Sequence, residues 1–285
     1  MKTWFITGVS SGFGRAIADA ALAAGDRVVG TLRGEEQQAA FTALVPGRSF
    51  GIILDVTDEP AIRPAIDRVE REVGPIDVLV NNAGYGHEGT FEESTMADLR
   101  RQFEVNVFGA VAVAQAVLPA MRKRRAGHII NITSMGGLIT LPGLSFYHGS
   151  KFALEGLSEA LGKEVKGLGI HVTAVAPGSF RTDWAGRSMN RAPRAIADYD
   201  ALMDPIREKR LAMSGKQIGN PAKLGEAVVK LVSSDNPPAH LLLGSDARTL
   251  VDRKLAELAA EYDAWDALTR STDFGDESAA ANSWA

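Results

Sequence analysis

The sequence predicts a single-domain α/β fold: a doubly wound, mostly parallel sheet of seven strands with helices on both faces. Short apolar runs alternate with longer amphipathic stretches along the 285 residues, which is typical of a parallel sheet covered on both sides. The polar and glycine-rich motifs all follow strands. In such folds the ligand crevice lies at the carboxyl ends of the strands, where the winding direction switches.

The element boundaries follow from these runs. The expected strands are Thr3–Thr7, Arg27–Thr31, Ser49–Leu54, Ile76–Val80, His128–Thr133, Ile170–Val175 and His240–Leu243. The expected helices are Phe13–Ala24, Glu35–Leu44, Glu59–Glu72, Met96–Lys123, Phe146–Lys166, Pro221–Ser234 and Ala247–Leu268. The catalytic domain therefore covers 1–268, with a substrate lid over about 179–219, where the alternation breaks. A polar tail over 269–285 is expected to be disordered.

Composition excludes several classes of function. Hydrophobic residues make up 45% and charged residues 23%, as in ordinary globular proteins, and the net charge of −4 offers no basic field for nucleic acid. Cysteine is absent, which excludes disulfides and thiolate metal sites, and no metal is expected. No uninterrupted apolar stretch reaches the roughly eighteen residues of a membrane span. The first residues are too short for a secretory segment, so a cytoplasmic location is expected.

A glycine-rich turn separates the first strand from the first helix. It reads Thr7-Gly8-Val9-Ser10-Ser11-Gly12-Phe13-Gly14, with the spacing Gly-x3-Gly-x-Gly. Glycines allow a sharp turn and a close approach of the backbone to a pyrophosphate at the positive end of the helix. Alone, the pattern fits an ordinary strand-to-helix loop equally well. Its place in the first βα unit favours a dinucleotide site.

The end of the second strand indicates which dinucleotide binds. A carboxylate there would select NAD by bonding the ribose diol, whereas an arginine accommodates the extra phosphate of NADP. The sequence has Thr31-Leu32-Arg33, and the planar guanidinium suits a phosphate. NADP(H) is therefore preferred, while Glu35 and Glu36 in the same loop keep NAD(H) possible.

Tyr147 and Lys151 lie four residues apart, which on a helix places phenol and ammonium on one face. Two unit charges 4 Å apart interact by about 4 kcal/mol at an effective dielectric near 20, so the lysine could lower the phenol pKa by up to roughly three units before desolvation. Ser134, after the fifth strand, could bond a substrate oxygen. The alternatives are an ordinary surface pair and a turn serine.

In combination these motifs resemble those of the short-chain dehydrogenase/reductase family, whose fold is Rossmann-like, from Thr7 to about Thr182. The resemblance implies a catalytic tetrad of Asn106, Ser134, Tyr147 and Lys151. It also implies cofactor contacts in the glycine turn (Gly8, Ser10, Ser11, Gly12, Phe13 and Gly14), at Arg33, Asp55 and Val56, at Asn82, Ala83 and Gly84, at Tyr147 and Lys151, and at Pro177, Gly178 and Thr182.

By this resemblance Tyr147 donates a proton to a carbonyl oxygen, or accepts one in the reverse direction, while Ser134 orients that oxygen. Lys151 bonds the nicotinamide ribose, and Asn106 holds a water that connects Lys151 to solvent. The closest branch contains hydroxysteroid and retinol dehydrogenases and bacterial ketoreductases. Helix Met96–Lys123 could pair across a homodimer, whereas the long C-terminal end puts the usual tetramer in doubt.

The expected reaction interconverts a hydrophobic ketone or aldehyde and its alcohol. The pocket walls are expected to be Met135–Leu144 and the lid, with the apolar candidates Leu138, Leu141, Trp184, Met189 and Met203. No charged residue identifies itself as an anchor for an acidic substrate. Two alternatives stay open: a non-catalytic NADP(H)-binding redox sensor, and an epimerase or dehydratase that works through transient oxidation.

Overall fold

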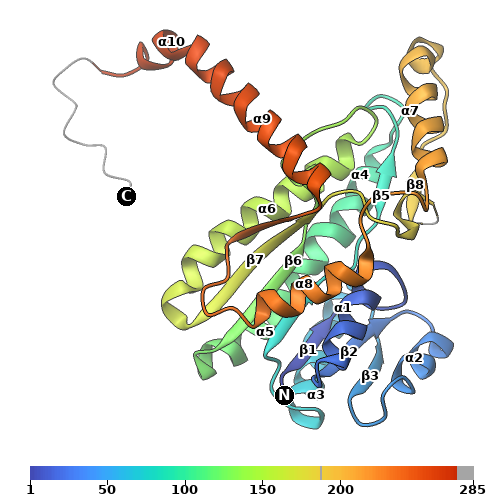
Figure 1. Cartoon of the computed structure of the whole chain (residues 1–285), viewed down its shortest axis with the longest axis vertical. Helices are drawn as coiled ribbons and strands as arrows, with labels where there is room; N and C mark the ends of the chain where they lie inside the picture. The colour runs from blue at the N-terminus through green and yellow to red at the C-terminus, as the bar shows by residue number, and fades with distance from the viewer. Residues whose placement is uncertain (187, 275–285) are drawn as a thin grey trace.

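A computed structural model describes residues 1–186 and 188–274 (Figure 1). In this part of the chain one sheet of seven parallel strands has the order β3-β2-β1-β4-β6-β7-β9. The strands are β1 (Thr3–Ile6), β2 (Arg27–Leu32), β3 (Ser49–Ile53), β4 (Val78–Asn81), β6 (Gly127–Ile132), β7 (Ile170–Pro177) and β9 (His240–Leu243). The winding direction reverses between β1 and β4, so the doubly wound prediction and its seven strands are confirmed.

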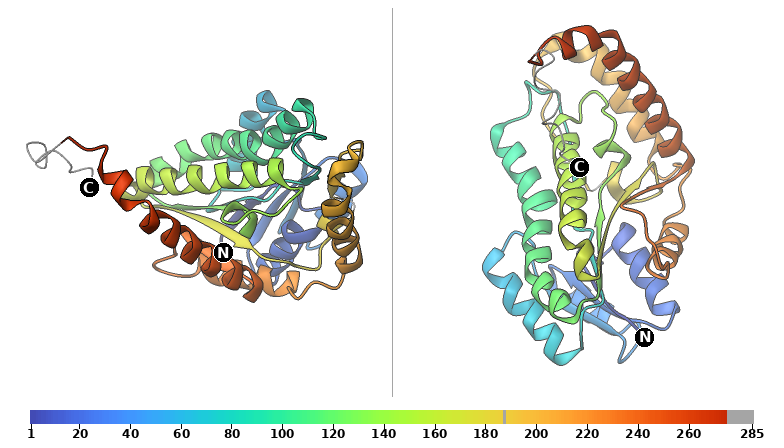
Figure 2. Two further views of the ribbon diagram at one scale, coloured as in Figure 1. Left: turned by 90° about the horizontal axis from the view of Figure 1, so that it is seen from above. Right: turned by 90° about the vertical axis from the view of Figure 1, so that its left-hand side faces the viewer.

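Helices cover both faces of this sheet (Figure 2). One layer contains α1 (Gly12–Ala23), α2 (Glu35–Thr42) and α8 (Pro221–Val232), and the other contains α3 (Glu59–Glu72), α5 (Gly109–Arg124) and α6 (Ser145–Val165). Consecutive residues of β1 pack on opposite faces of the sheet, because strand side chains alternate between faces. Trp4 belongs to the hydrophobic core under the first helix layer and Phe5 to the core under the second.

The long helix expected over Met96–Lys123 is confirmed but interrupted. It consists of α4 (Met96–Phe103), a π-helical turn (Glu104–Phe108) and α5. By length and composition alone it could cross a membrane, yet 44% of its most apolar window is buried and α5 packs on α3 and the sheet. We therefore interpret it as a core helix. Pairing of this helix across a homodimer stays a prediction; on its surface Phe108 is 55% exposed.

Three elements near the expected substrate side have no counterpart among the expected strands and helices. β5 (Gly86–Glu88) pairs in parallel with β8 (Met189–Arg191), and α7 (Asp200–Met213) follows within the expected lid. Short 3-10 turns occupy Met135–Gly137, Lys166–Leu168, Asp183–Ala185 and Ala197–Tyr199. The lid is thus a folded segment that reaches back to the loop after β4.

The C-terminal part is helical beyond the expected boundary at 268. α9 (Ser245–Ala264) and α10 (Asp266–Arg270) extend away from the sheet (Figure 1). The first two residues of the expected tail therefore belong to a helix. Residues 275–285, for which disorder is expected, lie outside the described residues.

Candidate active site

The glycine turn connects β1 to α1 and has the geometry that an anion requires. Gly8 and Gly12 have φ angles of 73° and 62°, in the left-handed region that favours glycine. A Cβ on Gly14 would lie 2.2 Å from the Gly8 carbonyl oxygen, so no other residue fits there. Ser11 is the N-cap of α1 but makes no side-chain bond to its first turn, which leaves those N–H groups available. The turn therefore fits a pyrophosphate.

Residues after β4 fix the shape of this turn. The Asn82 side-chain amide donates to the carbonyl oxygens of Thr7 and Gly8 at 2.8 and 2.9 Å. The Thr7 hydroxyl accepts the N–H groups of Asn82 and Ala83, each at 2.9 Å. The side chain of Asn82 is thus used to hold the turn. Thr7 begins the glycine-rich motif, but the sequence did not predict this role of its hydroxyl.

Arg33 and Asp55 lie at the ends of the neighbouring strands β2 and β3. The Thr57 N–H and hydroxyl bond Asp55 Oδ1 at 3.0 and 2.8 Å. The Thr57 backbone bond above all, and then the Thr57 hydroxyl and the charge of Arg33, lower the pKa of Asp55 against the effect of burial. Arg33 is exposed, whereas Val56, which follows Asp55 in the chain, is buried.

The two glutamates that kept NAD(H) open have a structural role of their own. Glu35 and Glu36 occupy the first turn of α2, where carboxylates are stabilised by the helix dipole. Stabilisation of the helix end thus accounts for the two glutamates without a contact to the cofactor ribose.

Ser134 and Tyr147 are in direct contact at the end of β6. The Ser134 hydroxyl bonds the phenol of Tyr147 and also accepts the Gly136 N–H at 2.9 Å. Tyr147 is only 7% exposed, and this burial raises its pKa to about 12, with the Ser134 bond acting in the opposite direction. The expected lowering of the phenol pKa is therefore wrong for these residues by themselves, because desolvation outweighs the opposing bond from Ser134.

Lys151 follows Tyr147 by one turn of α6, as expected. Its Nζ lies 5.9 Å from the centre of the Tyr147 ring and donates to the Ile132 carbonyl oxygen at 2.8 Å. Burial lowers the pKa of Lys151 to about 8, and the charge of Glu155 acts to raise it. At neutral pH the ammonium is thus still charged, in a place where charge is costly.

Asn106 lies in the π-helical turn, where one extra residue redirects the side chain out of the helix. Its Oδ1 accepts the Tyr85 N–H, and its Nδ2 donates to the Tyr85 carbonyl oxygen and the Ser150 hydroxyl, all at 3.1 Å. A Cβ on Gly84 would lie 3.0 Å from Asn106 Oδ1. Asn106 thus ties the loop after β4 to α6. Ser150, which joins them, was not foreseen.

The segment after β7 closes the crevice. Pro177 ends that strand, and the Gly178 N–H donates to the Leu243 carbonyl oxygen at 2.8 Å. A Cβ on Gly178 would lie 2.3 Å from Asp246 Oδ1. Thr182 caps the following 3-10 turn. These residues border the same edge of the sheet as the glycine turn, which fits the expected position over a nicotinamide.

Apolar side chains of the lid lie against the Tyr147 phenol. Trp184 and Met189 pack with Leu144 and Tyr147, and the rings of Tyr147 and Trp184 are 5.2 Å apart. Of the other expected wall residues, Met203 is buried beside Gly143, whereas Leu138 is half-buried and Leu141 is exposed. At the base of the lid, Phe180 packs edge-on against Phe13 of the turn, at 5.3 Å.

His148 supports the opposite wall. Its Nδ1 bonds the Gly136 carbonyl oxygen at 2.7 Å, and its Nε2 accepts the Leu141 N–H at 2.9 Å. Because Nε2 accepts, the ring is neutral with its proton on Nδ1, and burial accordingly lowers its pKa. His148 thus holds the loop after Ser134 in place.

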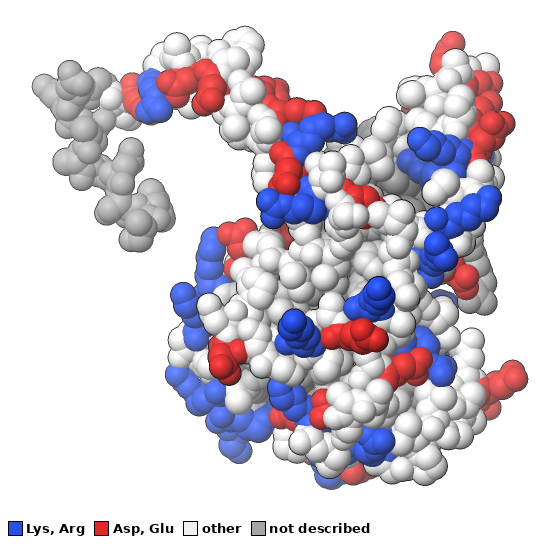
Figure 3. All heavy atoms as spheres, viewed as in Figure 1, with Lys and Arg blue, Asp and Glu red and all other residues white. Residues whose placement is uncertain are grey.

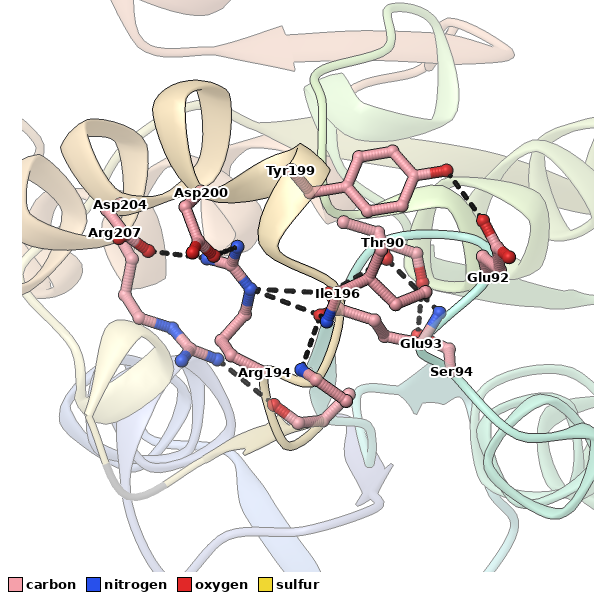
Figure 4. Close-up of polar contacts among 12 residues, drawn as sticks. Thr90, Glu92, Glu93, Ser94, Arg194, Ile196, Tyr199, Asp200, Asp204 and Arg207 are labelled. Carbon is pink, nitrogen blue, oxygen red and sulfur yellow. Dashed lines mark hydrogen bonds and ion pairs between the residues drawn. The ribbon is translucent and has the colours of Figure 1, made fainter.

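A buried carboxylate fastens the lid to the body (Figure 4). Glu93 accepts the Ala195 and Ile196 N–H groups at 2.7 and 3.0 Å and the Thr90 hydroxyl at 2.9 Å, and it pairs with Arg194. These bonds, the Ala195 bond first, lower the pKa of Glu93 to about 2. The Glu93 carboxylate therefore stays ionised over the physiological pH range.

Comparison with known proteins agrees with this geometry. The sequence pattern described as short chain dehydrogenase matches residues 2–192. The chain is 40% identical to Oxidoreductase BOA17 of Botryotinia fuckeliana, over 94% of this chain and 98% of that protein. It is 38% identical to a 3-ketodihydrosphingosine reductase of Bacteroides thetaiotaomicron, over 84% and 86%.

Solved structures give the same result. A short-chain dehydrogenase from Streptomyces avermitilis superposes with a TM-score of 0.89 at 40% identity, covering 96% of this chain and all of that one. A serine dehydrogenase complexed with NADP+ superposes with a TM-score of 0.73 at 25% identity, over 85% and 94%. The chain belongs to the short-chain dehydrogenase/reductase family and is an NAD(P)-dependent oxidoreductase.

Proposed function

We propose that this enzyme uses NADP(H) to interconvert a hydrophobic ketone or aldehyde and its alcohol, with Tyr147 as the general acid and base. The observation that carries the proposal is the arrangement of Tyr147 between Ser134, which bonds its hydroxyl, and Lys151, whose Nζ lies 5.9 Å from its ring. All three lie at the sheet edge that also carries the glycine turn.

The cofactor preference rests on Arg33. The residue is exposed after β2, near Asp55, and no carboxylate ends the strand where a ribose diol would be bonded. The relative solved with NADP+ supports the same preference. The α1 N–H groups and the turn glycines would hold the pyrophosphate, Pro177, Gly178 and Thr182 would border the nicotinamide, and the bound cofactor supplies or accepts the hydride.

The protein residues then transfer the proton to or from the substrate oxygen. A pKa of about 12 keeps the Tyr147 hydroxyl protonated at neutral pH, so it is ready to donate to a carbonyl oxygen that Ser134 orients. The proton leaves a phenolate, which the charged Lys151 stabilises inside a site of low polarity. Asn106 keeps the Tyr85 loop and Ser150 fixed beside these groups, and a water held there would return a proton to Lys151.

Apolar contacts support a hydrophobic substrate. Leu144, Trp184 and Met189 pack with Tyr147, and a 3-ketodihydrosphingosine reductase is among the relatives. The test is oxidation of NADPH and of NADH by purified protein with aliphatic, aromatic and steroidal ketones, together with direct measurement of NADPH binding. Turnover with NADPH in excess of NADH supports the proposal.

Other outcomes would favour the alternatives. Tight NADPH binding without turnover on any carbonyl would favour a redox sensor. Hydride retained within the product would favour an epimerase or dehydratase. The oxidoreductase names of the relatives favour neither.

A further inference from the structure

A line of charged side chains runs along α6 from the site to the surface. Lys151, Glu155, Glu159 and Lys163 follow one another at intervals of four residues, which places them on one face of the helix. Lys151 and Glu155 are each only 6% exposed, whereas Glu159 and Lys163 form an ion pair at the surface. On the face of the molecule in Figure 3, acidic and basic side chains are interspersed at the surface, where water screens them. Lys151 and Glu155 are buried, where screening is much weaker.

Two consecutive residues at the end of β6 bind both buried side chains. Lys151 Nζ donates to the Ile132 carbonyl oxygen at 2.8 Å. The hydroxyl of the next residue, Thr133, donates to Glu155 Oε1. A Cβ on Gly137 would lie 2.8 Å from the Lys151 carbonyl oxygen and 2.9 Å from Glu155 Cγ, so glycine lets the 3-10 turn after β6 pack directly on this turn of α6. The ammonium and the carboxylate are therefore held at the same place in the fold.

Both oxygens of the Glu155 carboxylate have a hydrogen-bond partner. The Thr133 hydroxyl is also 2.9 Å from the Val175 carbonyl oxygen, but that oxygen already accepts the Thr133 N–H at 2.8 Å, so the hydroxyl hydrogen is available to Glu155. The second carboxylate oxygen, Oε2, is 2.9 Å from Nδ1 of His240 in β9. Because an ionised carboxylate only accepts, the His240 ring carries a proton on Nδ1. The carboxylate of Glu155 is thus fixed in one position.

The other titratable groups of α6 do not take the place of Glu155. Tyr147 and His148 are neutral at physiological pH, because burial raises the pKa of the phenol to about 12 and lowers the pKa of the imidazole. Glu159, in the next turn, has a side chain that is 46% exposed and pairs at the surface with Lys163.

Titratable side chains on the neighbouring elements are exposed or have other partners. The exposed ones are Arg100 and Arg101 of α4, Glu104 of the π-helical turn and His171 of β7. The others bond elsewhere: His87 to Ser94, Glu88 to Arg207 and Arg210, His128 to Thr173, and Asp246 to the Ser179 N–H. Burial lowers the pKa of Lys151 to about 8, and Glu155 is the charged group that acts in the opposite direction. Glu155 thus offsets part of the desolvation of the ammonium.

We propose that Glu155 is a positioning residue of the reaction, whose buried carboxylate keeps the Lys151 ammonium charged while Tyr147 gives up its proton. Glu155 acts through Lys151, and Thr133 and His240 hold its carboxylate in place. The charged ammonium then stabilises the phenolate that the transfer leaves. The inference rests on the proposed function for the use of this charge, whereas the effect of Glu155 on Lys151 can be measured without any substrate.

The first experiment titrates Lys151 by NMR in protein that contains isotope-labelled lysine. The Lys151 signal is identified by its absence from the spectrum of Lys151→Met, and its chemical shift is followed with pH. Glu155→Gln should lower the midpoint of this titration by about one pH unit, because a unit charge about 10 Å away at an effective dielectric near 20 shifts a pKa by about that much.

Further variants separate the charge of Glu155 from its packing. Glu155→Met should give the same shift as Glu155→Gln, and it leaves few unmet bonds because Thr133 can donate to the Val175 carbonyl oxygen and His240, 42% exposed, can bond water. Glu155→Asp keeps the charge and should titrate close to the wild type. Glu159→Gln is the matched control: it removes the same charge from the exposed next turn and should leave the midpoint unchanged. Circular dichroism melts identify a variant that fails to fold.

The second experiment measures kcat for ketone reduction as a function of pH. The wild type should lose activity as Lys151 loses its proton, and this alkaline limb should lie about one pH unit lower in Glu155→Gln. The limb should stay in place in Glu159→Gln. A purely structural role of Glu155 would lower kcat at every pH without moving the limb.

Two results would overturn the proposal: a Lys151 midpoint that neither Glu155→Gln nor Glu155→Met lowers, or an equal shift in Glu159→Gln. A lowered midpoint together with an unmoved kcat limb would support the electrostatic link between Glu155 and Lys151 and count against the proposed function. Shifts of both, by a similar amount, are the predicted result.

Discussion

Replacing Lys151 by methionine should stabilise the protein while inactivating it. The buried ammonium has a pKa of about 8 in place of its ordinary 10.5, so at neutral pH the fold carries a charge that it disfavours. The difference corresponds to about 3 kcal/mol, at roughly 1.4 kcal/mol per pH unit. Methionine loses the bond to the Ile132 carbonyl oxygen, which costs about 1 kcal/mol. The free energy of unfolding should therefore rise by about 2 kcal/mol.

The pH dependence of this gain is the sharper test. The native pKa lies below the unfolded one, so the penalty in the wild type is present in full below pH 8 and disappears as the pH rises toward 10.5. Lys151→Met should thus be more stable than the wild type at about pH 7 and should have lost this advantage at about pH 10. Urea unfolding at both pH values measures the midpoint, with the slope m as the check that the extent of unfolding is unchanged.

Lys163→Met is the matched control. Lys163 lies on the same helix, pairs with Glu159 on the surface and has a side chain that is 75% exposed. An exposed ion pair contributes about 0–1 kcal/mol, so this variant should change stability little at either pH. A Lys151→Met protein less stable than the wild type at neutral pH, or one whose gain is independent of pH, would refute the reasoning about the buried charge.

Three further predictions concern the turn, the cofactor and the lid. Gly14→Ala should lose NADPH binding by at least about tenfold, measured by fluorescence titration, because its Cβ would meet the Gly8 carbonyl oxygen at 2.2 Å; unchanged affinity would contradict the geometry of the turn. Arg33→Asp should shift the ratio of kcat/KM values from NADPH toward NADH by about tenfold or more, by replacing a phosphate partner with a repelling charge; a constant ratio would exclude Arg33 from phosphate binding. Glu93→Gln should loosen the lid, because glutamine lacks the negative charge that pairs with Arg194 and that strengthens the bonds from two backbone N–H groups. Limited proteolysis between Arg191 and Met213 would detect the loosening. Cleavage as slow as in the wild type would show that these contacts do not need the charge.

The elements that could be predicted are those with a clear period or run. Most strands of the main sheet are largely buried apolar runs, although β9 is only half-buried, and α1, α3, α6 and α8 have long apolar faces. β5 and β8 are three residues each, too short for alternation to appear, and they pair across more than a hundred residues of chain. α7 has one fully buried residue, Met203, so its sequence resembled a charged loop.

The site was predictable in its residue types but not in its energetics. The spacing of Tyr147 and Lys151 fixes one helix face, which the structure confirms. The sign of the Tyr147 pKa shift depends on burial by Leu144, just before the same helix, and by Met189 and Trp184 of the distant lid. The ion pairs of Glu88 with Arg191 and Arg210 could not be predicted for a similar reason, since only the fold brings these residues together.

The central claim is that Tyr147 transfers the proton, and Tyr147→Phe tests it most directly. The substitution removes only the hydroxyl, so NADPH affinity should stay within about twofold of the wild type while kcat for ketone reduction falls by at least about a thousandfold. Measuring both on the same preparation gives the answer. Near-normal binding with lost turnover is the predicted result, and a variant that keeps a substantial fraction of the wild-type rate would contradict the assignment.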